Sequence, residues 1–264
     1  MTGIERLTRT FGKDKRIKLM AHAVCGFPDV QTSRRILDAM AESGADIIEA
    51  QLPFSDPSAD GPSIVEANYS ALRAGSRTET CLASLEGLRR TSELPILVMS
   101  YLNPLLAFGI EALVERAAKS GLDGFIVPDY PDDEPELGLA EKCTSAGLAL
   151  VPLITPTTSI KRAEELAAAT NSPFLYVVLR LGVTGRKTEL DSSSFERLAT
   201  LKASTGKYIA AGFGIRERAQ IEALSGVADC AIVGSALVDA ARIAAAEGRD
   251  PALAVGSLVR QLRN

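Results

Sequence analysis

The clearest evidence for the fold is the segment KYIAAGFGIRERAQIEALSGVADCAIVGSA, residues 207–236. It holds two short apolar runs, 207–211 and 230–234, with a helical pattern between them. In both runs the odd and the even positions are mostly apolar, which is typical of parallel strands that are buried on both faces. Gly212 and Gly214 follow the first run, and the second run ends in Gly234. The stretch therefore predicts a unit of strand, helix and parallel strand, with a glycine-rich turn after each strand.

The same pattern recurs along the rest of the chain. Apolar runs alternate with helical patterns, and we expect Asp29 to cap one helix and Ser76, with Glu79, to form a capping box on another. Eight strands, each followed by a helix, favour a (β/α)8 TIM barrel over a doubly wound sheet, because no GxGxxG motif follows the first strand. No linker divides the chain, so we expect a single barrel domain over residues 1–264. The other six runs are 18–24, 46–52, 95–101, 124–128, 148–153 and 173–179.

The composition argues against several classes of protein. The chain has 29 Lys and Arg against 33 Asp and Glu, and this acidic balance disfavours nucleic acid as the main partner. A single histidine disfavours most zinc and non-haem iron sites. Four dispersed cysteines without a CxxC pair suit a reducing compartment. The charged N-terminus does not resemble a signal peptide and no apolar run is long enough to span a membrane, so we expect a cytoplasmic protein.

Glycine-rich turns after the last two strands predict a phosphate site. Gly214 follows the seventh strand, and Gly234 and Ser235 follow the eighth. Glycines let the backbone approach an anion closely, and a helix that begins at Ser235 would direct free N–H groups toward it. Each turn alone is explained equally well as a tight connection, but two such turns on adjacent strands are the recurring phosphate site of TIM barrels. A third turn, GVTG at residues 182–185, follows the sixth strand and could close over the ligand.

Elimination leaves carboxylates as the groups that carry the chemistry. A Schiff-base aldolase needs a lysine near the carboxyl end of a strand, and only Lys187 is placed near one. Glu49 lies inside the apolar run 46–52, where a lone carboxylate is costly unless it is neutralised or paired. It is therefore a candidate proton donor and acceptor. Asp60 lies in the unusually long segment after the second strand, where ordinary turn chemistry is the alternative explanation.

Other residues near the strand ends have roles that the pattern leaves open. Tyr101 and Tyr176 end the third and sixth strands, where they line an aromatic pocket or belong to the core. His22 is the only histidine, and we expect it to be a hydrogen-bonded pocket or core group. Asp56 and Asp129 are expected to shape loops.

The segment EAQLPFSDPSADGPSIVEAN, residues 49–68, closely resembles the signature of the tryptophan synthase alpha chain family. That signature reads E-x-G-x-P-F-S-D-P-x-A-D-G-P and is followed by A-N. Further matches, in the family's order and over nearly the whole chain, are CGFPD, SYLNP, GFIVPDYP, GVTG, GFGI and VGSA. A match of this length is highly specific.

The resemblance implies a TIM barrel that cleaves indole-3-glycerol phosphate to indole and glyceraldehyde 3-phosphate by a retro-aldol reaction in tryptophan biosynthesis. It implies that Glu49 is the general acid and base and that Asp60 is the second catalytic carboxylate. Tyr176 matches a tyrosine near the substrate, and Tyr101 and His22 complete the expected substrate pocket.

The resemblance also implies how the phosphate and the partner are bound. The phosphate would lie at Gly214, Gly234 and Ser235, and the turn after the sixth strand would close through Thr184 and Gly185. The family works as an α2β2 complex with the tryptophan synthase beta chain, which carries pyridoxal phosphate, and the segment with Asp56 faces that partner. The alpha chain itself needs no cofactor and no metal.

Three departures from the family pattern surround the indole end of the expected site. His22 stands where the family has an aromatic residue, Gln51 stands where it has glycine, and the segment TGRK, residues 184–187, places its arginine one residue early. These departures keep a second hypothesis open, a divergent paralogue that acts as a stand-alone indole-releasing lyase or on another phosphorylated substrate. A third hypothesis, a ligand-binding or activating subunit without catalysis, is disfavoured because both carboxylates are retained.

Overall fold

The computed structural model describes residues 1–131, 137–179, 192–212 and 214–264. Its strands are β1 (Lys18–Val24), β2 (Ile47–Gln51), β3 (Ile96–Met99), β4 (Gly124–Ile126), β5 (Ala149–Val151), β6 (Leu153–Ile154), β7 (Phe174–Val178), β8 (Tyr208–Gly212) and β9 (Cys230–Val233). Its helices are α1 (Gly3–Gly12), α2 (Val30–Glu42), α3 (Pro62–Arg73), α4 (Thr78–Arg89), α5 (Leu102–Phe108), α6 (Ile110–Lys119), α7 (Leu139–Ser145), α8 (Ile160–Ala169), α9 (Ser192–Thr205), α10 (Arg218–Ala223), α11 (Ser235–Ala246) and α12 (Pro251–Arg263).

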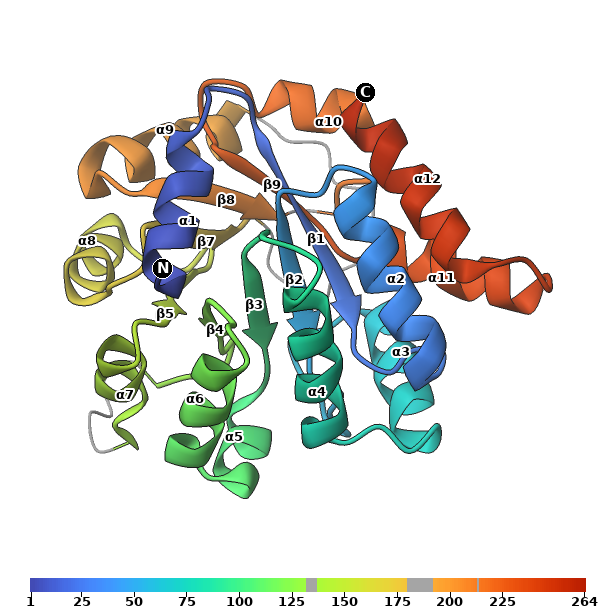
Figure 1. The fold of residues 1–264 in the computed structure, drawn as a ribbon. Helices are drawn as coiled ribbons and strands as arrows, with labels where there is room; N and C mark the ends of the chain where they lie inside the picture. The colour runs from blue at the N-terminus through green and yellow to red at the C-terminus, as the bar shows by residue number, and fades with distance from the viewer. Residues whose placement is uncertain (132–136, 180–191, 213) are drawn as a thin grey trace.

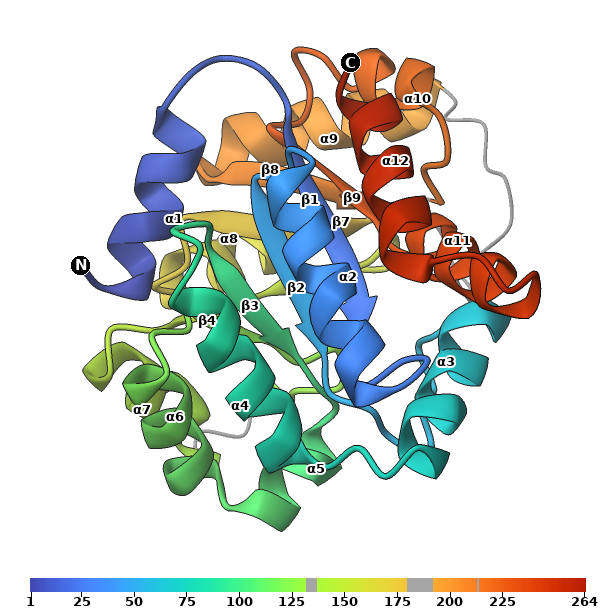
Figure 2. The same cartoon turned by 45° about the vertical axis from the view of Figure 1, so that its right-hand side comes forward.

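The strands form a parallel sheet that curls into a nearly closed barrel with the helices outside it (Figures 1 and 2). The order across the described part of the sheet is β5-β4-β3-β2-β1-β9-β8-β7-β6. The strand predicted over 148–153 is divided into β5 and β6, which form the two ends of the sheet. Pro152 lies between them and has no N–H to donate, which interrupts the hydrogen-bond ladder. The structure confirms the expected α/β architecture, a nearly closed parallel barrel surrounded by helices.

Side chains alternate between two apolar cores, because successive residues of a strand point to opposite faces. One core lies between the strands and the surrounding helices and includes Leu37, Ile48 and Val98. The other fills the barrel interior and includes Met20, Ile47 and Ile232. A residue two positions after one of these interior side chains therefore also points into the barrel, nearer the carboxyl ends of the strands.

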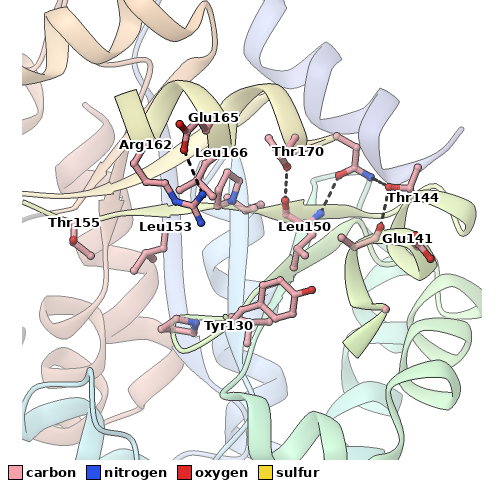
Figure 3. A pocket seen from close by; sticks show the side chains of 18 residues that line it. Tyr130, Glu141, Thr144, Leu150, Leu153, Thr155, Arg162, Glu165, Leu166 and Thr170 are labelled. Atoms are coloured by element: carbon pink, nitrogen blue, oxygen red, sulfur yellow. Dashed lines mark hydrogen bonds and ion pairs between the residues drawn. The ribbon is translucent and has the colours of Figure 1, made fainter. Parts of the chain in front are cut away.

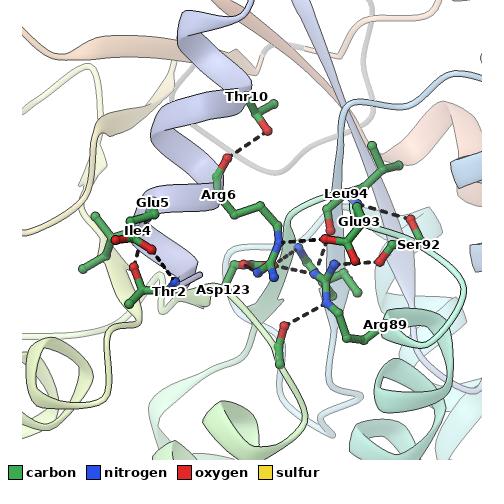
Figure 4. Close-up of polar contacts among 12 residues, drawn as sticks. Thr2, Ile4, Glu5, Arg6, Thr10, Arg89, Ser92, Glu93, Leu94 and Asp123 are labelled. Carbon is green, nitrogen blue, oxygen red and sulfur yellow. Dashed lines mark hydrogen bonds and ion pairs between the residues drawn. The ribbon is translucent and has the colours of Figure 1, made fainter.

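The amino end of the barrel is closed by α1 and a buried charged network (Figure 4). The Phe11 ring stacks on Tyr208 with ring centroids 4.9 Å apart. Arg6 of α1 and Arg89 of α4 both donate to the Asp123 carboxylate, and the Arg89 Nη2–Asp123 Oδ2 distance is 2.7 Å. Asp123 also accepts from the Ile96 backbone N–H at 2.7 Å. This end of the barrel is therefore packed and paired, which is the pattern of a stabilising face.

One of the two predicted helix caps is confirmed and the other is wrong. The Asp29 side chain accepts from the Thr32 backbone N–H at 2.9 Å, as expected at the start of α2. Ser76 does not cap α4, because the N-cap is Arg77, whose N–H donates to Thr80 Oγ1 at 3.0 Å. The Ser76 side chain is instead packed against Gly26, where an added Cβ would lie 1.7 Å from Ser76 Oγ. Tertiary packing therefore displaces the local capping preference.

Within the described residues, no helix is both long and apolar enough to cross a membrane.

Candidate active site

The strand alternation brings His22 and Glu49 together inside the barrel. Glu49 follows the interior residue Ile47 by two positions on β2, and His22 follows Met20 in the same way on β1. The two strands pair in parallel with His22 opposite Glu49. His22 is 4% exposed and Glu49 is 2% exposed, so both polar side chains lie in a nearly water-free position.

His22 and Glu49 form a contact that leaves one polar atom of each side chain unused. His22 Nδ1 lies 3.4 Å from Glu49 Oε1. His22 Nε2 and Glu49 Oε2 are buried and have no hydrogen-bond partner among the described residues. Burial lowers the pKa of His22 and is the largest single effect, but Glu49, together with Asp60 and Gln51, outweighs it, and the net effect raises the pKa above its ordinary value. Two unused polar atoms in a buried position indicate a place for a ligand.

Asp60 is brought to the same place and is held by Gln51. Gln51 Nε2 donates to Asp60 Oδ2 at 2.7 Å, and both side chains are buried. Burial raises the pKa of Asp60 in spite of this hydrogen bond, and the Glu49 carboxylate adds to the increase. Gln51 is not among the site residues predicted from the sequence. It lies two positions after Glu49 on the same strand and therefore points to the same face, which is the signal that could have identified it. Its Oε1 is a further buried atom without a partner among the described residues.

The two tyrosines predicted near the site have different surroundings. The Tyr101 hydroxyl accepts from the Ala59 N–H at 3.0 Å, and its ring lies 5.5 Å from the Phe54 ring. Tyr101 therefore holds the segment that carries Asp60. Tyr176 lies on β7, and burial, followed by the charge of Glu49, raises its pKa well above the ordinary value. Its hydroxyl therefore stays protonated beside the carboxylates.

The predicted phosphate-binding residues lie next to His22. Gly234 precedes α11, and a Cβ added to it would lie 3.7 Å from His22 Cβ and from Cγ of the imidazole ring. Ser235 is the first residue of this helix and is buried. Gly214, after β8, has φ +81°, a conformation that favours glycine. Thr184 and Gly185, together with Lys187, lie outside the described residues.

The two other aspartates have the local contacts expected of residues that shape loops. Asp129 Oδ1 accepts from the Leu102 N–H at 2.8 Å, at the start of α5. Asp56 is exposed and accepts a hydrogen bond from the Ser55 hydroxyl. These hydrogen bonds join each aspartate to its own loop.

A separate pocket of about 290 Å³ lies beside α7 and α8 (Figure 3). Several of its polar lining groups are hydrogen-bonded within the lining. Asn171 Nδ2 donates to Thr144 Oγ1 at 3.0 Å, and Thr170 Oγ1 donates to the Leu150 carbonyl at 2.7 Å. This pocket contains none of the predicted site residues. No cluster of three His, Cys, Asp or Glu side chains suited to a metal ion occurs in the described parts of the chain.

Comparisons with known proteins identify the family of the chain. The tryptophan synthase alpha chain family profile matches residues 9–263. The tryptophan synthase alpha chain of Syntrophotalea carbinolica is 39% identical and is covered over 98% of this chain and 100% of its own length. That of Prochlorococcus marinus is 40% identical, with 99% and 97% covered.

Solved structures give the same result. A structure of Mycobacterium tuberculosis tryptophan synthase superimposes with a TM-score of 0.87 at 32% identity, covering 97% of this chain and 96% of the other. A mutant tryptophan synthase alpha-subunit from Pyrococcus furiosus gives a TM-score of 0.84 at 30% identity, covering 94% and 98%. The chain belongs to the tryptophan synthase alpha chain family.

Proposed function

We propose that Glu49 and Asp60 are the two catalytic carboxylates of this chain. The family assignment makes the chain a lyase that cleaves indole-3-glycerol phosphate in tryptophan biosynthesis. The observation that supports the proposed residues is the burial of both carboxyl groups in one interior position, with Oε2 of Glu49 unpaired among the described residues. Buried acids with an open hydrogen-bonding position are suited to proton transfer to a bound substrate.

The proposed chemistry uses the two carboxyl groups in different roles. Indole is a poor leaving group until its C3 carbon is protonated, and Glu49 supplies that proton. Asp60 stabilises the positive charge that develops on the indole nitrogen and accepts its proton. Glu49 then removes the proton of the glycerol hydroxyl, the carbon–carbon bond breaks, and its electrons return to the ring as the aldehyde forms. Asp60 finally returns the nitrogen proton, so indole and glyceraldehyde 3-phosphate leave with all protons accounted for.

The remaining site residues are proposed to bind the rest of the substrate. Gly214, Gly234 and Ser235 follow β8 and β9, the seventh and eighth strands of the (β/α)8 barrel that we propose, and bind the phosphate through backbone N–H groups at the start of α11. Tyr176, Tyr101 and His22 line the pocket. We also propose that Thr184 and Gly185 close over the bound substrate.

The wider setting of the chain is part of the same proposal. The family needs no cofactor in the alpha chain, and pyridoxal phosphate belongs to the beta chain. We propose an α2β2 complex with the beta chain, in the cytoplasm, with the exposed Asp56 in the segment that faces the partner. We also propose that residues 1–264 form a single domain.

Two substitutions test the assigned carboxylates, and a third is their control. Glu49→Gln and Asp60→Asn keep the size of the side chain but remove its acid. We expect each to reduce indole release from indole-3-glycerol phosphate by a factor of about 100 or more, with an unchanged circular dichroism spectrum. Asp56→Asn removes an exposed carboxylate four positions from Asp60, and the isolated variant should turn over like the wild type. Near wild-type turnover in Glu49→Gln would contradict the assignment.

A further inference from the structure

We infer that His22 is a positioning residue for Glu49: it holds Oε1 through its Nδ1–H, turns Oε2 toward the substrate, and shares with Glu49 the proton that the reaction uses. This inference rests on the proposed role of Glu49. Beyond that role, it identifies Oε2 as the oxygen of Glu49 that reacts and gives the His22 imidazole a function beside it.

The geometry distinguishes the two oxygens of Glu49. Oε1 lies 3.4 Å from His22 Nδ1, whereas Oε2 is buried with no hydrogen-bond partner among the described residues. The strand register places the two side chains opposite each other on rigid neighbouring strands. A carboxyl that is held at one oxygen presents the other in a fixed direction, so Oε2 is the atom that faces the reacting carbon.

The imidazole ring is itself held in place from the other side. A Cβ at Gly234 would lie 3.7 Å from Cγ and 3.8 Å from Cδ2 of His22. The ring is therefore packed between Glu49 and the start of α11, the proposed phosphate site. Its Nε2 is buried and unpaired among the described residues, which leaves this atom available to the bound substrate.

The charged groups around the pair account for the raised pKa of His22. The other titratable groups that interact with the pair are Asp60 after β2, Tyr176 on β7 and Cys230 on β9. Burial raises the pKa values of Tyr176 and Cys230 well above their ordinary values, so both stay neutral. The negative charge that His22 meets from these groups thus comes from carboxylates. The Glu49 and Asp60 carboxylates therefore favour the protonated imidazole, and His22 keeps its proton to a higher pH than an isolated imidazole would.

The first test uses the fact that His22 is the only histidine of the chain. In an untagged protein, the imidazole signal in a pH titration by NMR reports on this residue without assignment. We expect the pKa of His22 to lie above its ordinary value in the wild type and to be lower in Glu49→Gln, because the Glu49 carboxylate then no longer opposes the effect of burial. Equal titration in the two proteins would overturn the inference.

The second test is the pH profile of indole-3-glycerol phosphate cleavage in His22→Phe and His22→Asn. One variant is aromatic and the other is polar, but neither titrates. We expect the alkaline fall of kcat to begin at a lower pH in both, by about one pH unit, a tenfold change in proton affinity. If His22 only fills space, the rates change by a constant factor and the position of the fall is unmoved, which would contradict the inference.

Glu49→Gln distinguishes a failure of the role of Glu49 from a failure of the role of His22. If Glu49→Gln turns over normally, the proposed function of Glu49 fails. If Glu49→Gln is inactive while both His22 variants keep the wild-type pH profile, only the role of His22 fails.

Discussion

Three residues of the site carry buried polar atoms that lower the stability of the folded protein. His22, Glu49 and Gln51 each leave one buried atom without a hydrogen bond among the described residues. Each such atom costs about 1–3 kcal/mol of folding free energy, because water is lost without replacement. Three of them in one place are explained if the substrate supplies the missing partners. The position of Glu49 inside an apolar strand predicts that it is buried in the barrel. The Gln51–Asp60 hydrogen bond could not be predicted, because it depends on the path of the loop between the two residues.

Asp60 should reduce stability as the pH rises. Burial raises its pKa in the folded protein, so its contribution to stability is fully present below the ordinary carboxyl value of 3.8 and is lost as the pH rises through the folded value. Asp60→Asn does not titrate and should have a higher Tm than the wild type, by a margin that widens between about pH 4 and pH 7. Scanning calorimetry at several pH values measures this margin. A margin that is constant or shrinks with pH would contradict the buried position of Asp60, and Asp56→Asn should show no such trend.

Individual elements show where local rules hold and where packing overrides them. The Asp29 cap was predictable because its partner Thr32 is three residues away. The start of α4 was not, because Ser76 packs against Gly26, fifty positions earlier in the chain. The division of the strand over 148–153 was not predicted, although the missing donor of Pro152 is a local signal for it. Elements that depend on long-range contacts are therefore the ones that the sequence predicts least well.

The start of α11 should be sensitive to added negative charge. Ser235 is the first residue of the helix, where an acidic side chain normally favours the helix dipole. We expect Ser235→Asp to raise KM for indole-3-glycerol phosphate by about tenfold or more, because the carboxylate takes the place of the substrate phosphate. Steady-state kinetics measures KM. The matched control is Ser159→Asp, at the exposed N-cap of α8, and an equal KM change in both variants would argue against a phosphate site at α11.

The network under α1 should stabilise the fold without affecting the chemistry. Asp123→Ala leaves Arg6 and Arg89 without their shared carboxylate in a buried position. We expect a loss of about 3–5 kcal/mol in the free energy of unfolding by urea, with unchanged kcat for the protein that remains folded. Glu222→Ala breaks an exposed pair with Arg218 and should cost about 0.5 kcal/mol or less. A small loss in Asp123→Ala, or a large fall in kcat, would contradict the separation of the two barrel ends.

The two ends of the barrel have different roles, stability at the amino end and the candidate site at the carboxyl end. The amino end is closed by α1 and by the ion pairs of Asp123 with Arg6 and Arg89, whereas the carboxyl ends of β1 and β2 carry the cluster of buried polar atoms without hydrogen-bond partners among the described residues. The sequence predicted this architecture well, since eight alternating units and a long family signature specify it. It could not predict how His22 and Gln51 are accommodated, because both depart from the family pattern. The structure places each beside one of the two carboxylates, His22 at Glu49 and Gln51 at Asp60.

Indole release from indole-3-glycerol phosphate by the purified chain, with and without a tryptophan synthase beta chain, tests both the lyase activity and the proposed partner. We expect slow release by the chain alone and faster release when the beta chain is added. No release in either condition from a folded protein would contradict this expectation.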